Sequence, residues 1–432
     1  MDQDVLFFPL IFPYQYDTID SSDQKGGIHV NQGIIAAILS ILFYLTNLLS
    51  GAQGQPIHPI DPPMTQQSYV VLGQTGTVTA DRVTVRHSPA SDGKPLGTVT
   101  RNTTITILDQ VENWYKIRPR IGIEGWIPEY AVSIERVERK EVEHTFLGFY
   151  PGGKQAYESL LENGTKLTSM APLGWKLDSY GGLIADFDPE EMGRSLYFAG
   201  NQEMDTYAHV HVGSSPSRLL STSYLQANSL SQLQDTLEEW GLKGVLVDID
   251  YVPGEEQPQL FEFLGQLATR LRQKGLKTMV ALPWDATIEY KAAARAVDYI
   301  VLESARASTD QQSGPLTSIA EMEAMLQEIT HLVHPDKIIL AVSTGGLHWS
   351  RTGIPSALSH QEVLELAARE GASVKWDTNS KAPYFQYGAG REVWFENRYS
   401  VKYKLDLVKE YNLGGLALRD LGQEDSDIWT LF

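Results

Sequence analysis

Cysteine is absent from the 432 residues of this chain, and positive charge is scarce: 35 basic residues stand against 54 acidic ones, a formal net charge of −19. The absence of cysteine excludes disulfides, thiol nucleophiles and cysteine-ligated zinc. The acidic balance argues against nucleic acid as a partner, because phosphates require a basic surface. Charged residues make up 21% and hydrophobic residues 42%, which is typical of globular proteins. At about 150 residues per domain, the length predicts two or three domains.

Long hydrophobic runs are also rare, and the clearest one extends from Ile34 to Leu49 without a charged residue. It is short for a membrane-spanning helix, which needs about 20 residues, and long for a signal-peptide core. The small residues at 50–52 that follow are typical of a cleavage site. We therefore predict a signal peptide or transmembrane anchor at 34–50, after an N-terminal tail at 1–33, with a buried core helix as the alternative. The first two interpretations make the protein secreted, or attached to the membrane through this helix, with its domains extracytoplasmic.

A proline-rich linker at 51–73 precedes a small all-β domain, which we place at 74–136. Short stretches of alternating polar and apolar residues recur there about every ten residues, separated by turn residues, which predicts a small barrel. The stretches Val83–Arg86, Asn113–Lys116 and Gly125–Ile127 resemble the bacterial SH3-like domains. That resemblance implies binding to peptidoglycan, commonly to its peptide part; a spacer without a ligand is the alternative.

The remaining chain, 145–432, alternates strand-like and helix-like patterns. Near-continuous valine, isoleucine and leucine runs separated by amphipathic helices indicate a buried parallel sheet. Eight such units favour a closed (β/α)8 TIM barrel, an α/β fold whose chemistry lies at the carboxyl ends of the strands. The predicted strands are 146–150, 167–171, 208–212, 244–250, 278–282, 299–302, 337–342 and 415–418.

Two carboxylates, Asp248 and Asp250, end the fourth predicted strand and share one of its faces. Buried acids are costly unless they are paired or functional. Carboxylates at this end of a barrel strand are suited to acid catalysis on a glycosidic bond. The alternative is structural: both side chains cap loops or accept hydrogen bonds from buried amides.

The segments Leu242–Pro253, Val297–Leu302, Ala382–Phe385 and Val393–Glu396 resemble glycoside hydrolase family 18, the chitinase-like barrels, and within it the bacterial spore-cortex N-acetylglucosaminidases. The resemblance implies a substrate-assisted mechanism, in which the N-acetyl carbonyl of the sugar attacks the anomeric carbon. It assigns the general acid to Asp250 and the orientation of the acetamide to Asp248.

Several positions depart from the pattern of that family. Its fourth strand reads Asp-x-x-Asp-x-Asp-x-Glu, and the corresponding residues here are Lys243, Leu246, Asp248 and Asp250. The acid is therefore one methylene shorter, and a displacement near 1 Å costs on the order of 100-fold in rate. The sixth strand of that family usually ends in Met-x-Tyr-Asp, and here the stretch that begins with Glu303 stands in its place. The eighth strand usually places a tryptophan under the sugar, and here Arg419 stands at that position. Because buried charges need partners, we predict that Arg419 pairs with Asp250 or Glu303.

Four aromatic residues in predicted loops are candidates for stacking on sugar rings, beside Glu303 and Arg419. They are Trp284, Trp349, Tyr384 and Trp394. Core or rim packing is the alternative for each. The pairs His209-x-His211 and His331-x-x-His334 lack a third ligand, so we expect no metal and no cofactor.

These observations leave three hypotheses for the function. The first is an exported wall protein that binds N-acetylglucosamine-containing glycan, peptidoglycan or chitin-like, through a barrel with weakened or lost hydrolysis. The second is an active β-N-acetylglucosaminidase or chitinase-type hydrolase with Asp250 as general acid. The third is a structural, protein-binding barrel. The lost active-site residues favour the first.

Overall fold

The computed structural model describes residues 71–134, 144–213, 216–249, 253–304, 313–315, 317–350 and 355–432. The predicted tail, the hydrophobic segment 34–50, most of the linker and Asp250 lie outside these ranges. Within them, no helix combines the length and the hydropathy that crossing a membrane requires. The predicted signal peptide or anchor therefore stays a prediction.

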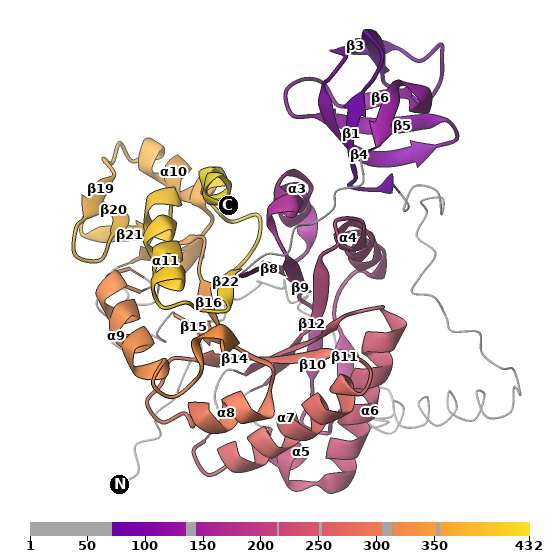
Figure 1. Ribbon diagram of the computed structural model, residues 1–432. Helices are drawn as coiled ribbons and strands as arrows, with labels where there is room; N and C mark the ends of the chain where they lie inside the picture. Colours follow the sequence, from indigo (N-terminus) through magenta and orange to yellow (C-terminus); the bar gives the residue numbers. More distant parts are fainter. Residues whose placement is uncertain are drawn as a thin grey trace, which may run out of the picture. The chain divides into compact units, whose positions relative to one another are not determined.

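The small β domain, indigo to purple in Figure 1, is a single seven-stranded antiparallel sheet with the order β3-β2-β6-β5-β4-β1-β7. The three stretches named above correspond to β2, β5 and β6, and the last strand, β7, follows the 3-10 turn Glu129–Ala131. Alternate residues such as Val83, Val85, Ile105 and Ile107 are buried in its core, as the period of two requires. The strands are β1 Thr75–Val78, β2 Arg82–Arg86, β3 Pro95–Thr100, β4 Thr104–Val111, β5 Trp114–Pro119, β6 Gly125–Pro128 and β7 Val132–Ile134.

The large domain is the predicted (β/α)8 barrel. Eight parallel strands follow one another in chain order, and pairing of β9 with β12 and of β8 with both β9 and β22 closes the ring. Each predicted strand corresponds to one of them, with bounds that differ by a few residues. The barrel strands are β8 Thr145–Tyr150, β9 Ser169–Pro172, β12 Asp205–Val212, β13 Gly244–Ile249, β14 Lys277–Pro283, β15 Tyr299–Glu303, β16 Ile338–Val342 and β22 Gly415–Leu418.

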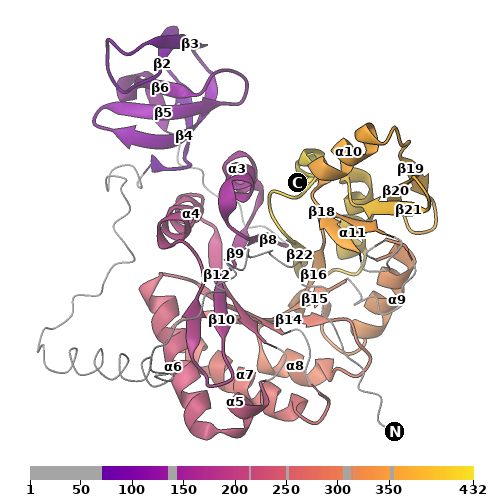
Figure 2. The same ribbon diagram turned by 180° about the vertical axis from the view of Figure 1, so that it is seen from behind.

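Helices cover the outside of the barrel strands, and both ribbon views place α6, α7, α8 and α9 there (Figures 1 and 2). Their apolar faces join the outward side chains of the strands in the largest core cluster. The helices between barrel strands are α3 Gly153–Asn163, α4 Pro189–Asn201, α5 Ser217–Ser221, α6 Ser223–Glu239, α7 Gln257–Arg272, α8 Tyr290–Ala296, α9 Ile319–Ile329 and α11 Arg398–Glu410. A hairpin of β10 Trp175–Leu177 and β11 Leu183–Ala185 extends the sheet beside β12.

The interior of the barrel is filled by a separate apolar cluster of inward-pointing side chains, as small barrels require. It includes Leu147, Phe149, Tyr207, Leu246, Met279, Val301, Ile339 and Ala417. These residues fix which face of each strand points inward. Because side chains alternate along a strand, every second residue beyond them also faces the barrel axis, now at its carboxyl end.

An insertion between β16 and α11 forms a second, five-stranded sheet with the order β18-β17-β21-β20-β19. Its strands are β17 Gly346–Trp349, β18 Ser356–Leu358, β19 Lys375–Asp377, β20 Ala382–Tyr387 and β21 Arg391–Phe395, and its helix is α10 His360–Arg369. One sheet face packs on α10 through Phe385, Val393 and Phe395. The opposite face carries Tyr384 and Trp394, which are cross-strand neighbours.

Candidate functional site

Four polar side chains follow the apolar interior of the barrel at its carboxyl end. Each side chain stands two residues after an inward-facing residue, either on the same strand or directly after the end of that strand. The four pairs are Tyr207 and His209, Leu246 and Asp248, Val301 and Glu303, and Ala417 and Arg419. The alternation of the strands therefore directs all four toward one another. We call these four residues the mouth cluster.

Arg419 is the centre of the mouth cluster. Its Nε donates to Oε2 of Glu303 at 3.2 Å and its Nη2 donates to Oε1 of the same carboxylate. Nη2 also donates to Oδ2 of Asp248 at 3.3 Å. The guanidinium carbon lies 4.2 Å from the ring centroid of Phe149, a cation–π contact. The predicted pairing of Arg419 with Glu303 is thus confirmed, and Asp248 is an additional partner.

His209 holds the other side of Asp248. Its Nε2 lies 2.8 Å from Oδ2 of Asp248, and its ring meets that of Phe149 edge to face at 5.7 Å. One carboxylate oxygen of Asp248 therefore accepts from both His209 and Arg419. The sequence interpretation treated His209 as structural, because it considered the His-x-His pair only as a metal site. Its place in the mouth cluster follows from the inward face of β12, which the register with β13 sets.

The mouth cluster is largely but not fully buried, with exposed side-chain fractions of 14% for Asp248, 18% for Glu303 and 22% for Arg419. Burial opposes ionisation of Asp248, but the charge of Arg419 and the hydrogen bond from His209 outweigh it and hold the pKa of Asp248 below its usual range. Asp248 is thus a carboxylate at neutral pH, and Nε2 of His209 is the donor. Burial, together with the charge of Asp248, raises the pKa of Glu303 against the opposing effect of Arg419.

The backbone around Arg419 is held at both ends of the residue. Its N–H donates to the carbonyl of Val342 at 2.9 Å, which continues the β16–β22 ladder, and its carbonyl accepts from the Thr344 hydroxyl. The next residue, Asp420, takes a φ of 57°, a left-handed conformation that aspartate adopts more readily than most residues. The chain then returns across the barrel, where Leu421 N–H donates to the carbonyl of Phe149. Arg419 is therefore anchored over the barrel axis.

Two predicted aromatic residues form a pair on the insertion. The rings of Tyr384 and Trp394 stack at 4.5 Å with an interplanar angle of 12°. Both side chains are half-buried, and Nε1 of Trp394 donates to Glu392 at 3.1 Å. The ammonium of Lys375 lies 5.9 Å from the ring of Tyr384. A stacked ring pair with polar groups at its rim has the chemistry of a sugar-binding platform.

The face that carries this pair turns toward the loops at the carboxyl end of the barrel. Trp349 shares that face through its register with Glu392, and its Nε1 donates at 2.9 Å to the carbonyl of Gly314, beyond β15. Trp349 itself is only 5% exposed. Its ring thus offers little surface to a sugar, and we leave it out of the proposed binding surface.

Trp284, the fourth predicted aromatic residue, follows directly after β14. Its ring stacks on Tyr290 at 5.6 Å with an interplanar angle of 19°, and it packs against the main core. The Tyr290 hydroxyl donates to the carbonyl of Pro283 at 2.5 Å, which fixes this pair at the carboxyl end of β14. Trp284 is half-buried and remains a candidate at the rim of the barrel mouth.

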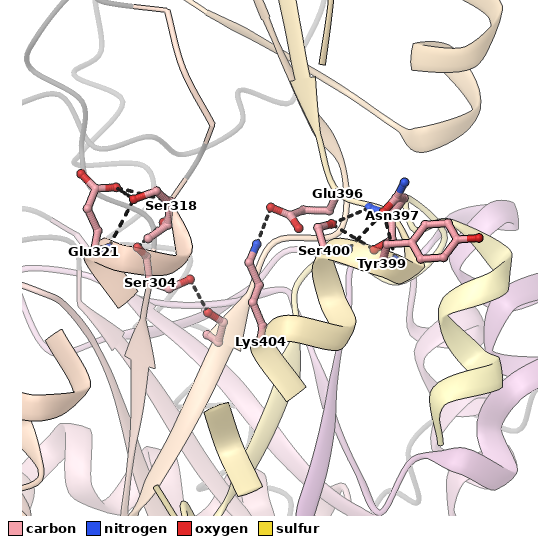
Figure 3. Close-up of polar contacts among 10 residues, drawn as sticks. Ser304, Ser318, Glu321, Glu396, Asn397, Tyr399, Ser400 and Lys404 are labelled. Carbon is pink, nitrogen blue, oxygen red and sulfur yellow. Dashed lines mark hydrogen bonds and ion pairs between the residues drawn. The ribbon is translucent and has the colours of Figure 1, made fainter. Parts of the chain in front are cut away.

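A second buried ion pair joins the insertion to α11. Lys404 on α11 donates to Oε1 of Glu396, the residue after β21, and the two side chains are 5% and 2% exposed. Oε2 of Glu396 is also buried and has no hydrogen-bond partner in the described part of the chain. Figure 3 shows this pair beside the start of α11, where Asn397 accepts from the N–H groups of Tyr399 and Ser400. The pair ties the end of β21, close to Trp394, to the barrel.

The mouth cluster is able to hold charge and donate hydrogen bonds, but its groups already engage one another. Both carboxylate oxygens of Glu303 accept hydrogen bonds from Arg419, and Oδ2 of Asp248 accepts from two donors, His209 and Arg419. Asp250, the predicted acid, lies outside the described residues. In the described ranges, no group of three or more histidine, aspartate or glutamate side chains has an arrangement suited to a metal ion.

Two family models match the chain. "Glycosyl hydrolases family 18" matches residues 212–424, and "Bacterial SH3 domain" matches residues 81–133. A curated relative, the cortical fragment-lytic enzyme of Bacillus anthracis, is 26% identical over 234 residues, which cover 49% of this chain and 54% of the relative. The chain therefore matches about half the length of that relative.

Solved structures share the fold. A chitinase from Chromobacterium violaceum is similar with a TM-score of 0.61 and 24% identity, covering 66% of this chain and 97% of the other. The spore cortex-lytic enzyme SleL of Bacillus megaterium is similar with a TM-score of 0.61 and 21% identity, covering 72% and 77%. At these identities the likeness concerns the fold.

Proposed function

Because the chain carries a bacterial SH3 domain and a barrel of glycosyl hydrolase family 18, we propose that it binds N-acetylglucosamine-containing cell-wall glycan at the barrel mouth with weakened or lost hydrolysis. The glycan is peptidoglycan or a chitin-like chain. The protein acts outside the cytoplasm, secreted or anchored through residues 34–50. Relatives named as cortex-lytic enzymes support a cell-wall ligand.

The ion pairing of Arg419 carries the proposal. The resemblance places a tryptophan under the sugar at this position, and here a guanidinium spans Glu303 and Asp248 above Phe149. A charged group in ion pairs replaces a flat apolar surface, so a sugar that enters loses that stacking contact. Breaking a buried ion pair by displacing one partner is costly, so a ligand does not easily push Arg419 aside.

Asp248 supports loss of catalysis as well. The role that the resemblance assigns to it is to orient the acetamide of the sugar next to the acid. Its Oδ2 here accepts from His209 at 2.8 Å and from Arg419 at 3.3 Å. Leu246, which stands where the pattern has another aspartate, is buried in the apolar interior. With its charge held by two cationic or donor groups, Asp248 has little freedom to move a proton with its neighbours.

Binding at the barrel mouth rests on the aromatic pair of the insertion rather than on the mouth cluster. The stacked Tyr384–Trp394 pair is held on a sheet face directed toward the carboxyl-end loops of the barrel. Flat aromatic surfaces bury the apolar faces of sugar rings, and half-buried rings are already fixed in place. Glycan affinity can therefore persist although the groups for bond cleavage are compromised.

The test measures binding and cleavage on the same full-length protein. Wild type, Trp394→Ala, Asp250→Glu and Asp250→Asn are mixed with purified insoluble peptidoglycan, and both sedimented protein and released reducing ends are measured. We expect wild type to sediment with the wall, and Trp394→Ala to bind roughly tenfold more weakly. We expect reducing-end release from wild type to be no higher than from Asp250→Asn. Tyr224→Ala, at a tyrosine 78% exposed on α6, is the matched control.

Each other result selects one of the alternatives. Release by wild type that disappears in Asp250→Asn identifies an active hydrolase with Asp250 as general acid. Wild type that neither sediments with the wall nor releases reducing ends leaves the structural, protein-binding barrel. Higher release by Asp250→Glu than by wild type indicates that the shortened acid, rather than Arg419, limits cleavage.

A further inference from the structure

Trp376 is exceptional among the tryptophans of this protein. All nine lie in the described residues, and Trp376 on β19, at 36%, is the most exposed of them. It is not one of the aromatic residues that the sequence pattern singled out. Since exposed tryptophan is costly in water, a cluster of such surface is a marker of a binding site.

A second exposed ring lies next to it on another element. Tyr403 on α11 is 41% exposed, and its ring centroid is 6.4 Å from that of Trp376 at an interplanar angle of 35°. The two rings are therefore close neighbours with tilted planes, and both residues remain partly exposed. The ammonium of Lys381 lies 5.5 Å from the centroid of Tyr403. This surface thus combines two partly exposed rings, a phenol hydroxyl and a cation.

This surface is distinct from the Tyr384–Trp394 pair. Trp376 is in register with Pro383 and its neighbour Lys375 is in register with Tyr384, so Trp376 and Tyr384 point to opposite faces of the β19–β20 ladder. The insertion therefore presents aromatic side chains on both faces near its edge strand.

The size and chemistry of this surface favour a polysaccharide over a protein. A stable protein interface buries about 800 Å² per partner, with a broad apolar centre. Here two rings stand beside one cationic residue, Lys381. A sugar ring needs one aromatic face and a few donors at its edge, and Lys381 adds a charge that complements the acidic groups of a wall polymer.

We propose that Trp376 and Tyr403 form a second glycan-binding surface, separate from the barrel mouth, that engages the same insoluble wall polymer. The inference rests on the proposed function, because it takes the polymer to be the ligand of the mouth. Two sites on one polymer raise the overall affinity by avidity, whereas a short soluble oligosaccharide occupies only one of them. Polymer binding and oligosaccharide binding therefore respond differently to loss of this surface.

The experiment compares two ligands on the full chain: insoluble peptidoglycan by sedimentation, and a soluble N-acetylglucosamine tetrasaccharide by calorimetry. For the double variant Trp376→Ala/Tyr403→Ala, we expect the affinity for the polymer to fall roughly tenfold or more, since two stacking rings are lost. We expect its tetrasaccharide affinity to stay within about twofold of wild type. Trp376→Phe/Tyr403→Phe keeps both ring faces and the fold, and is expected to bind the polymer like wild type.

The outcomes separate this proposal from the one it rests on. Polymer binding by the alanine variant equal to that of wild type, or an equal loss in the control Tyr224→Ala, overturns the second surface and leaves the barrel mouth untouched. Wild type that binds neither ligand overturns both proposals. Should the alanine variant unfold, Trp376→Gln alone provides the same comparison, with its thermal midpoint measured beside it.

Discussion

The mouth cluster and the Glu396–Lys404 pair are both buried ion pairs at the carboxyl side of the barrel, but they are built differently. The mouth cluster has four members on four strands, and 14–22% of its acidic and guanidinium side chains is open to solvent. The Glu396–Lys404 pair has two members, is almost sealed and leaves Oε2 of Glu396 without a partner. The first arrangement shares its charges among several groups, whereas the second depends on one contact.

This difference distinguishes a candidate ligand site, the mouth cluster, from a purely structural contact, the Glu396–Lys404 pair. The shared charges of the mouth cluster are partly open to solvent and lie at the carboxyl end of the barrel, where functional positions of such barrels lie. A sealed pair between β21 and α11 can only hold two elements together. We therefore expect substitutions in the Glu396–Lys404 pair to affect stability more than ligand binding. Substitutions in the mouth cluster should affect ligand binding more than stability.

Lys404→Met should have the largest effect on stability. It leaves Glu396 as an uncompensated buried charge, which costs about 3–5 kcal/mol of unfolding free energy. Removing both charges in Glu396→Leu/Lys404→Met should restore more than half of that loss, because the desolvation cost disappears with the carboxylate. Urea denaturation of the three proteins measures this. An unfolding free energy of Lys404→Met within about 1 kcal/mol of that of wild type would show that water reaches the pair.

Arg419→Met should destabilise less, by about 2 kcal/mol, because Glu303 and Asp248 lose a shared donor but retain access to water. Arg419→Lys is the control that keeps the charge and loses the two-pronged geometry, and we expect it to fall between wild type and Arg419→Met. The same denaturation experiment applies. If Arg419→Met were as damaging as Lys404→Met, the proposed distinction between open and sealed pairs would be wrong.

The acid dependence of stability should depend on Asp248. Its pKa is depressed in the folded protein, so the stabilisation is present above its unfolded value and is lost as the pH falls through the folded value. Wild type should therefore lose stability on acidification below about pH 4 more steeply than Asp248→Asn, by up to about 1.4 kcal/mol per pH unit. Thermal unfolding between pH 7 and pH 2 tests this, with exposed Asp81→Asn as control. Parallel profiles for wild type and Asp248→Asn would contradict it.

The smallest expected effect concerns the start of α11. Asn397 accepts from the N–H groups of Tyr399 at 3.0 Å and Ser400 at 3.1 Å (Figure 3). Asn397→Ala should cost about 1 kcal/mol, as at other helix N-caps. Ser318→Ala, which removes the cap of α9, is the matched control. A much larger loss in Asn397→Ala alone would mean that the cap also supports the neighbouring Glu396–Lys404 pair.

The barrel was predictable from sequence because its strands are continuous runs of valine, isoleucine and leucine, and burial on both faces leaves few other folds for such runs. The Arg419–Glu303 contact was one of two predicted pairings of Arg419. The resemblance places both residues at the barrel mouth, and a buried guanidinium needs an acid there. His209 was overlooked because its role depends on which face of β12 points inward. That face is set by register across neighbouring strands.

The aromatic residues were harder to interpret. Trp349 is buried and donates to the carbonyl of Gly314, which follows another strand, whereas Trp376 is exposed on the edge strand β19. Both facts depend on contacts between segments distant in the chain, and local composition carries no signal for them. Tyr384 and Trp394 were found because the resemblance covers β20 and β21.

The sheet of the insertion has one further consequence. Its two outer strands, β18 Ser356–Leu358 and β19 Lys375–Asp377, are three residues long. So short an edge, bearing a lysine and an aspartate beside Trp376, presents few unpaired backbone groups to another chain. The protein therefore exposes an aromatic side chain at the end of a β-sheet without offering a template for strand addition. We therefore expect strand addition between copies to be disfavoured at this edge.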